Sequence, residues 1–167
     1  MSPNNNHCYI YFQTHLKLIS NQKSVQEVRA YIQSVTGFKD VVIIEQLENL
    51  GLAKSIISGV TMLCEKNEQA IVLEDDLETS PYFLKYMNDS LVFYEGTPEV
   101  IHISGCRYPV EAFGTDDTFF LHVPLCWGWA TWKRAWCKFD KHISLMERFD
   151  RPMVKHFDFD GSYTFWG

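Results

Sequence analysis

Residues 71–76 read Ile71-Val72-Leu73-Glu74-Asp75-Asp76, a short apolar run that ends in three consecutive carboxylates. Such a run is typical of a strand buried in a parallel sheet. Ligands of open α/β sheets bind just beyond the carboxyl ends of these strands. Adjacent acids there repel one another, and Mg²⁺ or Mn²⁺ relieves that repulsion while also binding phosphate oxygens. We therefore predict a metal-diphosphate site at this strand end, with simple solvation of the strand end by the acids as the alternative.

Strand and helix patterns alternate on both sides of this stretch. Apolar, β-branched runs predict strands at residues 8–12, 41–44, 70–73 and 100–103. Apolar residues at helical spacing predict helices at residues 22–34, 52–64 and 80–94, with Ser80 as N-cap and Pro81 in the first turn of the third. This alternation indicates βαβ units and a largely parallel sheet. Beyond Arg107 the pattern changes, and we predict a strand at 118–123, a structured loop at 124–131, and helices at 132–139 and 145–157.

Composition narrows the class of protein. The 167 residues are 46% hydrophobic, which is enough for a folded core, and the net charge of −6 argues against a nucleic-acid partner. No apolar run approaches the roughly 20 residues that a transmembrane helix needs. The five cysteines form no Cys-x-x-Cys pair, and this odd number favours reduced thiols in the cytoplasm.

The segment Val72–Phe83 (VLEDDLETSPYF) resembles the core of GT-A-fold glycosyltransferases. The similarity is to bacterial sugar transferases of the glycosyltransferase family 2 type, and more distantly to N-acetylglucosaminyltransferase I. Residues 43–55, 103–105 and 126–132 also match, so the resemblance extends from about Val25 to the last residue. It implies an α/β fold of the nucleotide-diphospho-sugar transferase type, a three-layer sandwich with a mostly parallel sheet. In this family the last acid of the triplet binds the metal, which implies Asp76 as ligand and places Glu74 and Asp75 at the donor.

Further donor-binding residues are expected at a helix start, after a strand and around a glycine: Asn49, Lys54, Gly105, Trp127, Gly128 and Trp129. Free N–H groups at a helix N-terminus attract anions, and Lys54 lies one turn in, within reach of a phosphate. An Asn-Gly turn with a solvated lysine is the alternative. Aromatic rings around a glycine suit the face of a sugar, and the family resemblance implies the same location; core packing of the tryptophans is the alternative.

The segment Asp158-Phe159-Asp160-Gly161 supplies the candidate catalytic base. In inverting members of the family, an Asp in a comparable acid-aromatic segment removes the proton of the acceptor hydroxyl. The resemblance therefore implies Asp160 as base, with Asp158 as the second candidate. An N-cap for a final helix is the alternative.

The resemblance also implies that residues 1–167 are a single, incomplete GT-A-like domain. Members of the family have a complete first βα unit before Cys8 and continue past Gly167. The segment Tyr11–Lys17 stands where they carry Phe-Ser-Asp-Gly-Pro-Lys, and one set of codons for it, read back by one nucleotide, gives Phe-Ser-Asp-Ala-Pro-Lys. We therefore hypothesise that about the first twenty residues are read out of frame. Such an incomplete domain would expose sheet edges, which favours self-association.

The expected activity is metal-dependent transfer of a sugar from a nucleotide sugar, taken as a UDP-sugar, to a hydroxyl acceptor. A glycan or lipid-linked glycan acceptor in bacterial surface-polysaccharide synthesis, at the cytoplasmic face of the inner membrane, fits the family. A non-catalytic truncated remnant stays open as an alternative. So does a sugar-phosphate nucleotidyltransferase, although that class needs a glycine-rich, basic phosphate loop near its start, and none is present in this sequence.

Overall fold

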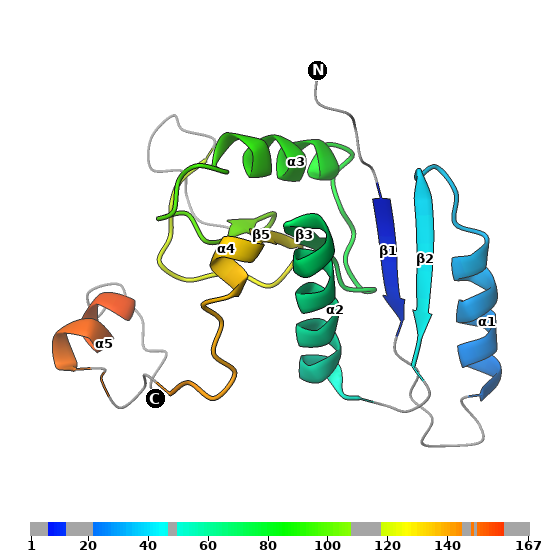
Figure 1. Ribbon diagram of the computed structural model, residues 1–167, viewed down its shortest axis with the longest axis horizontal. Helices are drawn as coiled ribbons and strands as arrows, with labels where there is room; N and C mark the ends of the chain where they lie inside the picture. Colours follow the sequence, from blue (N-terminus) through cyan, green and yellow to red (C-terminus); the bar gives the residue numbers. More distant parts are fainter. Residues whose placement is uncertain are drawn as a thin grey trace. The chain divides into compact units, whose positions relative to one another are not determined.

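The computed structural model describes residues 7–12, 22–46, 50–107, 118–144, 148 and 150–158. It is a mixed α/β structure (Figure 1) in which the contacts define two compact units, residues 1–66 and residues 67–167. Each unit contains a small sheet of its own. None of the helices within the described ranges combines the length and the apolar character that crossing a membrane requires.

The first unit pairs two parallel strands joined through a helix. Its elements are β1 (His7–Phe12), α1 (Gln22–Gln33), β2 (Asp40–Glu45) and α2 (Leu52–Asn67). β1 lies parallel to β2, in a register that sets His7 opposite Asp40. An ion pair of 3.2 Å between Arg29 and Glu45 connects α1 to the end of β2. The strands and helices predicted for this part of the chain are confirmed, with bounds that differ by at most a few residues.

The second unit is built on a three-stranded sheet. Its elements are β3 (Gln69–Val72), α3 (Phe83–Phe93), β4 (Ile103–Ser104), β5 (Trp129–Trp132), α4 (Lys133–Trp136) and α5 (Arg151–Phe157). The strand order is β3-β5-β4, and β5 runs antiparallel to both of its neighbours. β3 and β4 therefore point the same way, as expected for two strands joined through α3, but β5, which comes later in the chain than both, lies between them.

The predictions for the second unit are wrong in several details. Residues 129–131 were expected in a loop, whereas they belong to the central strand, whose four residues are all buried. Residues 118–123 were expected to form a strand, whereas the structure shows irregular chain there, exposed at residues 118–122. α3 begins at Phe83 rather than at Pro81, because Ser80 does not cap the helix: its hydroxyl accepts from the N–H of Tyr82 at 3.2 Å in a preceding turn.

The core of the second unit lies between α3 and the sheet. Phe83, Met87 and Leu91 follow one another at four-residue spacing, and therefore present one face of α3 to the strands. The indole N–H of Trp132 donates to the Leu91 carbonyl at 3.1 Å. The hydroxyl of Thr131 donates to the Ile101 carbonyl at 2.8 Å. These two bonds connect β5 to α3 and to the segment before β4.

Arg134 holds the C-terminal end of α3. Its guanidinium donates to the carbonyls of Tyr94 at 2.9 Å, Val100 at 3.0 Å and Glu95 at 3.1 Å. It also lies 4.3 Å from the ring centroid of Trp132. Carbonyls at a helix end have no partner within the helix, so one side chain here satisfies three such groups at and beyond the end of α3.

Candidate functional site

The three acids lie where the sequence predicted, directly after a strand of the second unit. β3 ends at Val72, and Asp75 and Asp76 form a turn in which the N–H of Leu77 donates to the Glu74 carbonyl at 3.4 Å. Glu74 is half-buried, whereas Asp75 and Asp76 are exposed. Two carboxylates at the strand end are therefore accessible to a solvated ligand.

Gly105 and Gly128 bring two segments of the chain into close backbone contact near this turn. The N–H of Gly105, just after β4, donates to the carbonyl of Gly128, just before β5, at 2.7 Å. A Cβ at Gly105 would overlap the Phe83 ring, and would lie 2.6 Å from the Met87 methyl group and 2.9 Å from the Gly128 oxygen. Gly128 has a φ of +69°, in the left-handed region that other residues rarely adopt. Both positions therefore require glycine.

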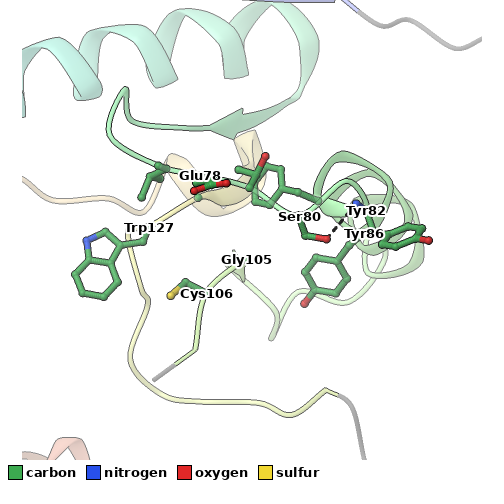
Figure 2. Close-up of a pocket in the computed structure, with 11 residues that line it drawn as sticks. Glu78, Ser80, Tyr82, Tyr86, Gly105, Cys106 and Trp127 are labelled. Atoms are coloured by element: carbon green, nitrogen blue, oxygen red, sulfur yellow. Dashed lines mark hydrogen bonds between the residues drawn. The ribbon is translucent and has the colours of Figure 1, made fainter. Parts of the chain in front are cut away.

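A pocket of about 380 Å³ opens over these glycines (Figure 2). Its lining comes from the segment after the acids, from the start of α3, and from the segments that follow β4 and precede β5. The lining residues are Leu77, Glu78, Thr79, Ser80, Tyr82, Phe83, Tyr86, Gly105, Cys106, Trp127 and Gly128. Since Leu77 directly follows Asp76, the acidic turn and the pocket lie next to each other in the chain.

Part of the predicted donor site is brought together here. Gly105, Trp127 and Gly128 all line the pocket. Trp129 does not; it is buried in β5, where its ring stacks on His102 at 5.2 Å between centroids. For Trp129 the structure thus shows the core packing that was the alternative.

The remaining predicted residues lie elsewhere in the chain. Lys54 is exposed in the first turn of α2 and belongs to the first unit. Asp158 is buried at the C-terminal end of α5, where its N–H donates to the Val154 carbonyl at 2.9 Å. It ends a helix rather than starting one. Asn49 and Asp160 lie outside the described residues.

Several pocket residues were not among those predicted for the site from the sequence: Glu78, Tyr82, Tyr86 and Cys106. Tyr86 falls within the helix predicted at residues 80–94, and its side chain is 39% exposed. Their spacing in the sequence could have indicated two of these residues, because residues four apart lie on the same face of a helix. Tyr82 and Tyr86 are such a pair, and they follow directly after the acids.

The acids suit a metal ion that takes only one or two protein carboxylates and its other ligands from water and substrate. Within the described ranges, no group of three or more His, Cys, Asp or Glu side chains is arranged to hold a metal ion. Mg²⁺ in phosphate-transfer sites commonly takes only one or two carboxylates and completes its shell with water and substrate phosphates. The exposed Asp76 and Asp75 suit such an ion, which would arrive with a diphosphate.

His102 supports the segment next to the pocket. Its Nε2 donates to the Leu125 carbonyl at 3.0 Å, which requires a proton on that nitrogen, and its ring stacks on Trp129. Burial lowers the pKa of His102, and the bond to Leu125 only partly offsets this effect. The neutral ring thus connects the segment before β4 to the one before β5.

We predict that the second unit loses stability in mild acid through His102. Because the pKa is lower in the folded chain, the unfolded chain binds more protons, so the contribution is fully present above about pH 6.5 and falls as the pH drops below that value. Urea unfolding between pH 8 and pH 5 should show this loss. His102→Gln, which keeps an N–H donor, should reduce the slope; equal slopes in the two proteins would contradict the prediction.

Comparisons of the chain with protein-family models, with curated proteins and with solved structures gave no match.

Proposed function

We propose that the chain carries the donor site of a metal-dependent glycosyltransferase with a GT-A-like fold. The observation that carries the proposal is the pair of exposed carboxylates, Asp75 and Asp76, in the turn that directly follows β3. Asp76 would bind a divalent cation together with the diphosphate of a nucleotide sugar, and Asp75 and Glu74 would lie at the donor. The cation, Mn²⁺ or Mg²⁺, would neutralise the charge that develops on the departing diphosphate.

The adjoining pocket supports this proposal. Gly105 and Gly128 allow a ligand to approach the backbone closely, and Trp127 offers an aromatic face beside them. In the proposed reaction a hydroxyl acceptor attacks the donor sugar, and Asp160, with Asp158 as the second candidate, removes its proton. A UDP-sugar donor and a glycan or lipid-linked glycan acceptor complete the proposal, with bacterial surface-polysaccharide synthesis on the cytoplasmic side as its setting.

The proposal predicts that UDP binds to the chain in the presence of Mn²⁺ and that Asp76→Asn strongly weakens this binding. The exposed carboxylate can be replaced without disturbing a buried contact, while the cation loses a charged ligand. We expect an affinity loss of roughly a hundredfold, the size typical of removing one partner of a close charge pair. Calorimetric titration of UDP, with and without Mn²⁺, measures both effects.

Glu99→Gln is the matched control, because it removes one exposed carboxylate from the same unit, at a turn after α3 outside the pocket. It should bind UDP as the unaltered chain does. A folded chain that does not bind UDP with Mn²⁺ would refute the proposal and would leave a non-catalytic domain as the better account. Binding of unchanged affinity in Asp76→Asn would place the nucleotide elsewhere.

A further inference from the structure

We propose that the pocket binds one uncharged sugar ring between Trp127 on one side and the pair Tyr82 and Tyr86 on the other. This ring would be the acceptor, so that Gly105, Trp127 and Gly128 would contact the acceptor rather than the donor. Its role as an acceptor site rests on the proposed function. Its capacity to bind a sugar rests on the pocket alone.

The walls of the pocket are aromatic and accessible. Trp127 lies on one side, and Tyr82 and Tyr86, one helical turn apart, lie on the other (Figure 2). Their exposed fractions are 48%, 75% and 39%, respectively. Large aromatic faces with a polar edge are suited to a ring that is apolar on its C–H faces and polar at its rim.

The floor of the pocket is fixed by the core. Phe83 is 8% exposed and Met87 is fully buried, and both lie directly beneath the Gly105 backbone. Gly105 is in turn bonded to Gly128 across the floor. A floor held in this way needs little rearrangement when a ligand binds, which lowers the cost of binding. The volume of about 380 Å³ is at the small end of ligand pockets and suits a single ring.

The charge of the lining selects a neutral ligand. Among the described residues, Glu78 is the one charged member of the lining and no lysine or arginine belongs to it. The acidic turn that ends at Asp76 directly precedes Leu77 and Glu78 in the chain. Phosphates and acidic sugars are therefore disfavoured. Hydroxyl groups of Thr79, Ser80 and the tyrosines can bond to the rim of a sugar, and the Glu78 carboxylate accepts hydrogen bonds from its hydroxyls.

A quaternary ammonium ion is the competing occupant, since aromatic rings and a carboxylate also attract such ions. The several hydroxyl groups of the lining favour the sugar, because an alkylated ammonium ion offers them no hydrogen bonds. Choline therefore serves as the competing probe in the experiment.

The experiment follows the indole N–H signals of the ¹⁵N-labelled chain by two-dimensional NMR. Methyl β-glucoside, methyl β-galactoside and methyl β-N-acetylglucosaminide are titrated separately, and Trp127→Phe identifies the Trp127 signal. We expect at least one glycoside to shift that signal saturably. The Trp132 signal should not move, because its N–H is buried and bonded to Leu91. Tyr86→Ala and Glu78→Gln should each weaken binding by about tenfold.

Tyr31→Ala is the matched control for the tyrosine variant, because Tyr31 is 73% exposed on α1 of the first unit and does not line the pocket. It should bind the glycoside unchanged. No shift of the Trp127 signal with any of the three glycosides overturns the inference, as does a response to choline alone. An unchanged affinity in Tyr86→Ala overturns it too.

Titration of UDP and Mn²⁺ into the same samples separates this inference from the proposed function. UDP binding without glycoside binding refutes only the sugar pocket. Glycoside binding without UDP binding supports the sugar pocket and refutes its role in glycosyl transfer.

Discussion

Replacing Gly105 by alanine is expected to destabilise the second unit by about 3 kcal/mol, at the upper end of the range for overpacked sites. The added methyl group would overlap the Phe83 ring and approach the backbone oxygen of Gly128 to 2.9 Å. Met87 has a flexible end that can move, whereas the Phe83 ring also lies close to Gly128, where an added Cβ would come within 2.9 Å of it. The chain must therefore shift at the 2.7 Å bond between the two glycines.

Urea unfolding followed by tryptophan fluorescence measures this effect. All five tryptophans lie between residues 127 and 166, so the signal reports on the second unit. Gly96→Ala is the matched control, because Gly96 lies in the turn after α3 with no atom within 4 Å of an added Cβ. Its stability should change by less than about 0.5 kcal/mol. Similar unfolding midpoints for Gly105→Ala and Gly96→Ala would show that the glycine contact is not a tight one.

Replacing Arg134 by methionine is expected to cost about 3 kcal/mol. Methionine keeps an unbranched stem over Trp132 but removes the guanidinium donor from the carbonyls of Glu95 and Val100. The Tyr94 carbonyl keeps the N–H of Thr97, at 3.0 Å. A polar group buried without a partner costs more than a typical hydrogen bond contributes. Arg134→Lys should have a stability between those of Arg134→Met and the unaltered chain. It keeps the positive charge, but an ammonium group cannot reproduce the planar fork that reaches three acceptors.

Arg107→Met is the control for charge, because it removes an exposed arginine of the same unit. It should leave the urea midpoint within about 0.5 kcal/mol of the unaltered chain. If Arg134→Met and Arg107→Met were equally stable, the three carbonyls would be satisfied without the guanidinium. An Arg134→Lys protein as stable as the unaltered chain would show that charge, rather than geometry, is what matters.

Local pattern was sufficient to predict the first unit and the start of the second. The helical spacing from Leu52 onward and the apolar run that ends at Leu73 each depend on near neighbours in the chain. The position of Glu74, Asp75 and Asp76 followed directly, because a strand end fixes where the next residues lie. The roles assigned to these acids remain predictions.

The position of β5 and the pocket depend on contacts between residues that lie far apart in the sequence. Residues 129–132 lack the polar-apolar alternation of a half-buried strand, since all four are buried. Their strand position depends on Thr131 reaching Ile101 and on Trp132 reaching Leu91, which no local pattern reveals. The same holds for the pocket, where residues near 80, 105 and 127 meet. The glycines of that floor were visible in the sequence, but not their contact with each other.

The place of β5 between β3 and β4 sets an order of events in the folding of the second unit. The two outer strands pair with β5 and not with each other, so the described sheet cannot form until residue 132 has been synthesised. Closing these long loops precedes the gain from pairing, which slows folding. During synthesis, the apolar strand β3 and the apolar face of α3 therefore stay without β5 as a packing partner until residue 132 has been made. A chain that stops before Trp129 would lack the strand to which both β3 and β4 pair.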